Sequence, residues 1–222
     1  MTKAGSATKK AGKKKTPRPR DAAASRKSIL DSALIEFSTK GYAGARIDEI
    51  ARRAGISKPL IYEYFGDKDA VYAASLREAY VQIRHGENAL NMAGLSPEAA
   101  IEALVIFTME HYRQNPWFIN MLNTENLRGG DSIRKIGDAS EIQSALIADL
   151  DTIIKKGQEA GTFRSGIEPV ELYIFIASLC YFPISNIHTL RAVFECSIDD
   201  EWLERRGREA AEMVVKYLRR DD

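Results

Sequence analysis

Hydrophobic residues recur along most of this chain at the three-to-four-residue spacing of amphipathic helices. In the first such segment Ile29, Ala33 and Phe37 lie four residues apart, on one face of a helix expected to begin near Ala22 and end at Gly41. No segment shows the sustained alternation of polar and apolar residues that marks a half-buried strand. The pattern therefore predicts an all-α protein of about nine helices.

Turn and capping motifs divide the rest of the chain. Ser96-Pro97 and Asn115-Pro116 each place a capping side chain before a proline suited to a first helical turn. Gly55, the pair Gly129-Gly130 and Gly161 interrupt the helical pattern. The ranges expected for the later helices are 47 to 54, 58 to 65, one from near 67, one from 97, one from 116, then 137 to 160, 169 to 190 and 199 to 219.

Composition is that of a globular protein, since 45% of the 222 residues are apolar and can fill a core. The longest apolar run, residues 172 to 184, is shorter than the roughly 20 residues needed to cross a bilayer, and it contains Pro183. No secretory signal follows the basic N-terminus, and Cys180 and Cys196 lie too far apart for a metal or redox motif. We expect a cytoplasmic protein with no membrane partner.

The N-terminal tail, residues 1 to 21, has a charge opposite to that of the body. The first 20 residues hold eight Lys and Arg and no Asp or Glu, whereas the rest of the chain holds 24 basic and 31 acidic residues. Without apolar periodicity the tail is expected to be disordered. It is either a solvated leader or an arm that lies along DNA phosphates, and the charge favours the arm.

The segment from Arg46 to Phe65 meets the steric requirements of a helix-turn-helix. Small Ala51 lets the second helix cross closely, and Gly55, four residues later, permits a left-handed turn. Ser57 is suited to cap the second short helix, and Pro59 lies in its first turn. Similar helix pairs occur in bundles that do not bind DNA, so simple packing is the alternative.

The outer side of the second short helix carries candidate DNA-reading residues, because Ile61 and Phe65 point inward four residues apart. Lysine can bond guanine or a phosphate, glutamate can accept from cytosine N4, and tyrosine can donate to phosphate or pack on a thymine methyl. Arg46 and Lys68 are suited to phosphates. The expected DNA contacts are Arg46, Lys58, Pro59, Tyr62, Glu63, Tyr64 and Lys68.

Several short motifs in this region occur at a characteristic spacing. They are Phe37, Gly41-Tyr42, Ile50-Ala51, Ala54-Gly55-Ile56-Ser57, Tyr62, Tyr64-Phe65 and Lys68. On these residues, positions 33 to 72 resemble the DNA-binding domain of the TetR family of transcriptional regulators. The resemblance implies DNA contacts from Lys58, Pro59, Tyr62, Tyr64 and Lys68. It also implies a DNA-binding domain over 22 to 67 and a ligand-binding and dimerisation domain over 68 to 222.

Arg46 departs from the threonine that many family members have at the entrance to the second helix. The Gly-x-Arg-Ile pattern here resembles the pyrimidine-utilisation repressor branch of the family. The C-terminal half resembles that branch more loosely, through Asn115-Pro116, Glu125-Asn126-Leu127 and Gly161. The pyrimidine ligand does not carry over, because the pocket residues cannot be matched one by one.

The resemblance further implies a homodimer on a pseudo-palindromic double-stranded DNA operator, released by a small-molecule effector that the sequence does not identify. Apolar stripes on the last two helices suit a dimer face, with an intramolecular core as the alternative: Ile174, Ala177, Ser178, Tyr181, Leu203, Ala210, Met213, Val214 and Tyr217. The candidate pocket residues, most of them expected in the core, are Met109, His111, Tyr112, Trp117, Phe118, Met121, Asn126, Phe175, Tyr181 and His188.

Other classes of function find less support in the sequence. No Ser, His and Asp are paired as nucleophile and base, and phosphate loops of the GxxxxGK or GxGxxG kind are absent, so an enzyme is not expected. No cofactor is expected, and the histidines lack the spacing of a metal site. A DNA-compacting or adaptor protein is a third class, which would show weak sequence preference and no response to metabolites.

Overall fold

The computed structural model describes residues 19–220, and these are almost entirely helical. Within that range lie ten α-helices and two 3-10 turns, with no strand beyond one isolated bridge between Phe163 and Arg219. The elements are α1 (Pro19–Gly44), α2 (Ile47–Ala54), α3 (Lys58–Phe65), α4 (Lys68–Ala89), η1 (Met92–Gly94), α5 (Pro97–Gln114), α6 (Pro116–Leu127), η2 (Ile133–Lys135), α7 (Ala139–Glu159), α8 (Pro169–Ser185), α9 (Ile187–Phe194) and α10 (Asp200–Leu218). The predicted all-α class is confirmed, with one helix more than the nine expected.

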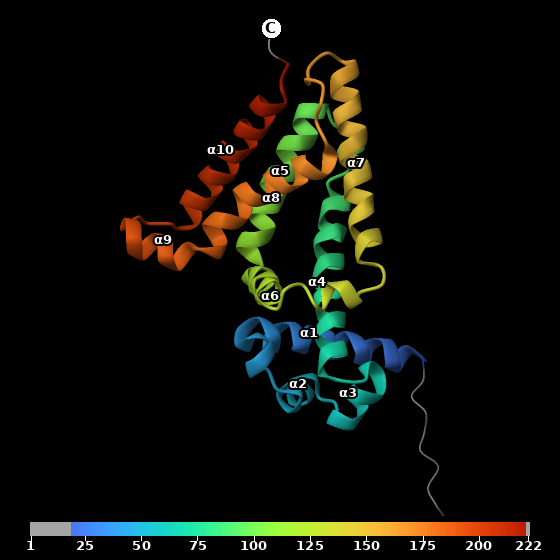
Figure 1. Ribbon diagram of the computed structural model, residues 1–222. Coiled ribbons are helices and arrows are strands. Elements are labelled where there is room, and N and C mark those ends of the chain that lie inside the picture. The colour runs from blue at the N-terminus through green and yellow to red at the C-terminus, as the bar shows by residue number, and fades with distance from the viewer. Residues whose placement is uncertain (1–18, 221–222) are drawn as a thin grey trace, which may run out of the picture.

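The helices gather into two groups joined by α4 (Figure 1). Helices α1, α2 and α3 pack around the N-terminal part of α4 at one end of the molecule. Helices α5 and α7 pack against its C-terminal part, α8 and α10 pack on α5, and α6 lies across α1 between the two groups. Because α4 belongs to both groups, a shift along it reaches both.

Most helix boundaries agree with the sequence pattern to within a few residues. The first helix begins at Pro19 rather than Ala22, while the predicted tail up to position 18 lies outside the described residues. Its regular geometry ends where predicted, since Gly41 has φ 64° and ψ 175° and the turn to Gly44 continues beyond this kink.

The single helix predicted over 169 to 190 is wrong. Helix α8 ends at Ser185, and α9 begins at Ile187 after a bend of 65°. Pro183 lies inside α8 and removes one backbone donor near its end, which weakens the last turn. In the described part of the chain no single helix has the length and apolarity to cross a membrane, and only the bent pair α8 and α9 passes that test jointly.

The two predicted Xaa-Pro capping sites differ in outcome. The Ser96 hydroxyl accepts a hydrogen bond from the Ala99 amide at 3.3 Å, as expected. The Asn115 side chain does not cap α6. Its side-chain nitrogen donates to the His111 carbonyl at 2.9 Å, and its side-chain oxygen accepts from the Trp117 indole at 3.1 Å. Because Asn115 also ends α5, its side-chain amide is used at that helix end.

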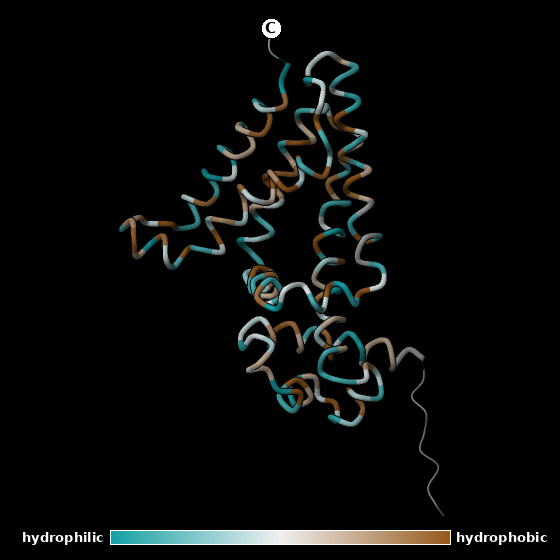
Figure 2. Tube along the Cα trace, in the orientation of Figure 1, coloured by the Kyte–Doolittle hydropathy of each residue, from teal (hydrophilic) through white to brown (hydrophobic). Residues whose placement is uncertain are grey.

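The core is continuous through both groups of helices. In the first group the ring of Tyr72 packs edge-on against Phe37 and Tyr42, with centroid separations of 4.9 and 5.3 Å, and so joins α1 to α4. In the second group Tyr112 of α5 stacks on Phe118 of α6 at 5.7 Å. Figure 2 shows apolar positions continuing along α8 to the outer end of α9.

Gly157 of α7 permits the close approach of Phe163, which is 2% exposed. A Cβ at this position would lie 2.2 Å from Cδ2 of the ring. Gly157→Ala is therefore expected to destabilise the fold by about 1–3 kcal/mol, although alanine favours a helix over glycine. Urea unfolding measures the change. Gly137→Ala is the control, because a Cβ there meets nothing within 4 Å; equal stability of both variants would contradict the packing argument.

Candidate nucleic-acid interface

Helices α2 and α3 form the predicted helix-turn-helix. Ile47, Ile50 and Ala51 bury the inner side of α2. Gly55 follows in the left-handed region, with φ 67° and ψ 28°, and the turn closes as the Ile56 amide donates to the Ala51 carbonyl at 3.0 Å. The space around Gly55 is open, so its backbone angle rather than crowding requires glycine there. The predicted turn is confirmed.

The start of α2 is held by a residue that the sequence analysis did not single out. Arg46 stands at the N-cap and its side chain makes no capping hydrogen bond, as expected for arginine. Its backbone amide instead donates to Oε1 of Glu36 at 3.2 Å. Glu36, from α1, is 5% exposed. A carboxylate from another helix therefore takes the role that a local capping residue usually has.

Helix α3 presents its outer side to solvent. Ile61 is fully buried, whereas Pro59, Tyr62 and Glu63 are exposed, with Tyr62 at 39%. Ser57 occupies the N-cap position, but the expected capping hydrogen bond from its side chain is wrong. Pro59 explains part of this difference, since a proline in the first turn leaves fewer amides to be capped. Three of the predicted reading residues thus lie on one accessible face.

The charged and aromatic neighbours of that face have partners within the chain. Lys58 bridges from α3 to Asp48 of α2 at 3.0 Å, and this carboxylate raises the pKa of the lysine. The ring of Tyr64 faces α1, with the Arg26 guanidinium carbon 5.0 Å from its centroid. Its hydroxyl is buried with no hydrogen-bond partner among the described residues. Tyr64 therefore supports α3 from behind.

Lys68 lies in the first turn of α4, where Asp67 caps the helix by accepting from the Ala70 amide at 2.8 Å. The ammonium nitrogen of Lys68 is 4.8 Å from the ring centroid of Tyr42. Burial and the charge of Arg128 lower the pKa of Lys68. The lysine belongs to a cluster of cations around one tyrosine.

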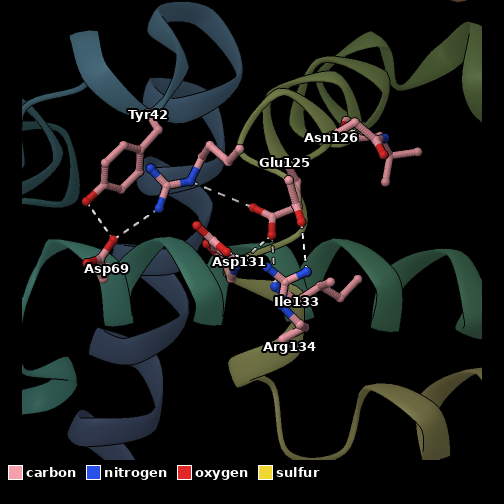
Figure 3. Close-up of polar contacts among 11 residues, drawn as sticks. Tyr42, Asp69, Glu125, Asn126, Asp131, Ile133 and Arg134 are labelled. Atoms are coloured by element: carbon pink, nitrogen blue, oxygen red, sulfur yellow. Dashed lines mark hydrogen bonds and ion pairs between the residues drawn. The ribbon is translucent and has the colours of Figure 1, made fainter.

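That cluster joins the helix-turn-helix to the body of the protein (Figure 3). The Tyr42 hydroxyl donates to Oδ1 of Asp69 at 2.6 Å, and a nitrogen of Arg128 lies 3.3 Å from the same oxygen. The guanidinium carbon of Arg128 lies only 3.5 Å from the centroid of the Tyr42 ring. The hydrogen bond from Tyr42 lowers the pKa of Asp69, so the carboxylate stays charged. The end of α1, the start of α4 and the end of α6 thus meet in one polar contact.

Glu125 extends the contact to the loop after α6. It is 5% exposed, and its Oε1 accepts from the amides of Ser132 at 2.6 Å and Ile133 at 2.9 Å. Its Oε2 lies 4.0 Å from Nε of Arg128. We call Tyr42, Asp69, Glu125 and Arg128 the interdomain cluster. It connects the loop of η2 to the helix-turn-helix (Figure 3).

The ten candidate pocket residues occupy different environments. Met109, Tyr112, Phe118 and Met121 are buried core residues, His111, Trp117, Phe175 and Tyr181 are half-buried, and Asn126 and His188 are exposed. Burial and the charge of Arg84 lower the pKa of His111 to about 4, so its ring is neutral near neutral pH. The described residues hold no cluster of His, Cys, Asp and Glu suited to a metal.

Two cavities lie elsewhere in the C-terminal group. One, of about 310 Å³ and here called the α4–α8 cavity, is lined by Arg77, Tyr80, Ile133, Ile136, Ile142, Gln143 and Tyr173. The other, of about 540 Å³, lies between α8, α9 and α10. None of the ten candidates lines either cavity. The residues of the α4–α8 cavity come from three separate stretches of the chain, around positions 77 to 80, 133 to 143 and 173, and no local motif marks them.

Comparison with known proteins gives matches to both groups of helices. Residues 29–75 match the family described as bacterial regulatory proteins, tetR family, and residues 97–214 match the tetracyclin repressor-like C-terminal domain. The HTH-type transcriptional repressor NicS of Pseudomonas putida is 35% identical over 184 residues, which are 83% of this chain and 87% of that protein. The HTH-type transcriptional regulator RutR of Escherichia coli is 32% identical over 165 residues, 72% of this chain and 73% of that protein.

Solved structures share the fold at lower identity. The fatty acid degradation regulator FadR of Bacillus halodurans superposes with a TM-score of 0.67 at 17% identity, covering 90% of this chain and 97% of that one. The ketosteroid regulator KstR2 of Mycobacterium tuberculosis gives 0.63 at 16% identity, covering 88% and 95%. At these identities the likeness concerns the fold alone.

The contact from Glu36 to the start of α2 generates a test. Glu36→Ala is expected to lower the free energy of unfolding by about 0.5–1.5 kcal/mol, because it removes the acceptor of the Arg46 amide at the start of α2. Glu36→Gln keeps an oxygen there and is expected to lose less. Chemical denaturation measures both, with exposed Glu102→Ala of α5 as the control. Equal losses in Glu36→Ala and the control would contradict this role for Glu36.

Proposed function

Because the chain belongs to the tetR family of bacterial regulatory proteins, and is therefore a DNA-binding transcriptional regulator rather than an enzyme, we propose that it represses transcription as an effector-released homodimer. The word repressor in the name of the relative NicS supports this direction of control. A regulator of this kind acts where the chromosome is, which in a bacterium is the cytoplasm. The observation that carries the proposal is the exposed outer side of α3.

Helix α3 is the element that enters the major groove in this proposal. Its inner side is fixed by Ile61, while Pro59, Tyr62 and Glu63 face outward and have the geometry for base contacts. Lys58 exchanges Asp48 for a base or phosphate oxygen, an exchange that costs little because exposed ion pairs are weak. Arg46 and Lys68 contact phosphates. Tyr64 is not assigned a contact, since its hydroxyl is buried.

Dimerisation is assigned to α8 and α10. Val170, Ile174 and Phe182 form an exposed apolar line along α8 and are 52%, 57% and 58% exposed. On α10, Met213 and Tyr217 are also exposed apolar residues, at 45% and 51% exposure. The other residues of the predicted stripe on α10, Leu203, Ala210 and Val214, are buried in the chain's own core. A two-fold axis at the exposed line would pair two α3 helices for a pseudo-palindromic operator.

Release follows from the connection between the two groups of helices. An effector in the C-terminal group that shifts α4 or the loop after α6 changes the interdomain cluster and, with it, the placement of α3. Two α3 helices in a dimer must fit half-sites one helical turn apart, so a small change of spacing weakens binding to the operator. Operator binding and effector binding then favour opposite states of one conformational equilibrium, so each weakens the other.

Operator binding is tested with Lys58→Ala. DNA fragments retained by the purified protein are first sequenced to define an operator, and affinity is then measured over a range of salt concentrations. The dimer loses one phosphate-directed charge from each half, which is expected to weaken binding roughly 25- to 100-fold and to reduce the slope of log K against log salt by about two. Lys155→Ala is the matched control, since Lys155 makes a similar exposed ion pair, with Asp151 at 2.6 Å, on α7. An unchanged slope in Lys58→Ala would contradict the placement of α3, and failure to enrich any sequence would contradict the function.

The dimer face is tested with Ile174→Glu, which places a charge in the middle of the apolar line. Light scattering coupled to size-exclusion chromatography is expected to show a monomer, while circular dichroism remains helical. Leu127→Glu is the control, because Leu127 is 90% exposed at the far end of α6. A dimer in both variants would mean that another surface mediates assembly.

A further inference from the structure

The α4–α8 cavity has a composition suited to a flat apolar molecule. Three isoleucines, Ile133, Ile136 and Ile142, and the rings of Tyr80 and Tyr173 form its walls. Arg84 contacts Tyr173, with a guanidinium nitrogen 3.3 Å from the phenol oxygen and the guanidinium carbon 5.5 Å from the ring centroid. These contacts fix the position of the Tyr173 ring. A volume of about 310 Å³ suits one or two rings.

A carboxylate already sits on the arginine at the edge of this cavity. Nε of Arg77 lies 2.9 Å from Oδ1 and 3.0 Å from Oδ2 of Asp138, and a terminal nitrogen of the guanidinium also donates to Oδ2. This is the fork geometry in which arginine binds carboxylates. Asp138 therefore shows where a carboxylate of another molecule would be held.

The contact with Asp138 is replaceable. The side chains of Arg77 and Asp138 are 45% and 34% exposed, and ion pairs at such positions contribute little net stability. Asp138 is also the N-cap residue of α7, yet its side chain makes no capping hydrogen bond. Releasing Asp138 from Arg77 therefore breaks no helix cap.

We propose that the α4–α8 cavity binds a small aromatic carboxylate, whose carboxylate replaces that of Asp138 on Arg77 while its ring lies between the isoleucines and the two tyrosines. This inference rests on the proposed function, in which the ligand is the effector. Gln143, at the same cavity, supplies a further polar group for a ring substituent.

The position of the cavity explains how such a ligand reaches the DNA-binding end. Ile133 and Ile136 belong to η2 and its C-cap, in the loop between α6 and α7 that Asp138 closes. The amide of Ile133 is bonded to Glu125, which lies beside Arg128 in the interdomain cluster. Release of Asp138 frees the far end of this loop from α4, and insertion of a ring displaces its isoleucines. Both changes act on Glu125.

The experiment uses the purified protein and a fixed set of probes, namely benzoate, cinnamate and 2-naphthoate, each paired with its amide. Isothermal titration calorimetry is expected to detect binding of at least one carboxylate and at least tenfold weaker binding of the matching amide. Arg77→Met is expected to remove this preference. Asp138→Asn removes the internal competitor and is expected to bind the carboxylate several-fold more tightly than the unaltered protein.

Asp151→Asn is the matched control, since it neutralises an exposed aspartate of α7 that pairs with Lys155 away from the cavity, and its affinity is expected to be unchanged. Binding of no carboxylate, equal binding of the amide, or a preference that survives Arg77→Met would overturn the inference. Operator binding without probe is measured on the same samples. If it is intact while these tests fail, only the ligand assignment falls; if no operator is bound at all, the proposed function falls as well.

Discussion

The placement of the helix-turn-helix relative to the rest of the chain depends on the guanidinium of Arg128. It lies 3.5 Å from the ring centroid of Tyr42 and also reaches Asp69, which the same tyrosine already bonds through its hydroxyl. A cation on an aromatic face is favoured where water is largely excluded, and Arg128 is 24% exposed. Because one side chain touches α1 and α4 from α6, any movement of α6 must either carry the helix-turn-helix along or break both contacts. The DNA-binding end is thereby made sensitive to the loop that follows α6.

Features set by neighbouring residues were predictable from the sequence. The turn at Gly55, the inward side of α3 at Ile61 and the cap at Ser96 each depend on a few consecutive residues and on backbone geometry. Apart from the missing Ser57 cap, the errors arose where one residue serves two elements. Asn115 ends α5 and begins α6. Asn186 likewise ends α8 and begins α9, so the bend there, soon after Pro183, divides an apolar run that the sequence pattern treats as one helix. Hydrophobic periodicity records which side of a helix is buried, but it does not record where the axis turns.

The candidate site was predictable only in part, for the same reason. The residues on the outer side of α3 follow from helical periodicity, whereas Glu36 acts on α2 from another helix ten residues earlier and Arg128 acts on Tyr42 from far along the chain. The cavity residues show the limit most clearly. Aromatic and amphipathic side chains such as Tyr112 and Phe118 suggested a pocket, yet they pack on one another in the core, and the cavity lies where α4, η2, α7 and α8 leave space. Such space is a property of how helices cross, which a single sequence does not specify.

The magnitude of the coupling constrains how a regulator of this architecture can work. Moving a protein from almost fully bound to almost fully released requires a ligand that prefers the released form by about 10⁴-fold. A carboxylate that merely replaces Asp138 on Arg77 exchanges one exposed ion pair for another and supplies little of this preference. A two-fold dimer holds two sites, so each needs to contribute only the square root, roughly a hundredfold, if the two halves change together. That amount is available from burying a ring between Ile133, Ile136 and Tyr173 in one conformation of the loop but not in the other. In this scheme the ion pair decides which molecules enter the cavity, and the apolar contacts supply the free energy that separates the two states.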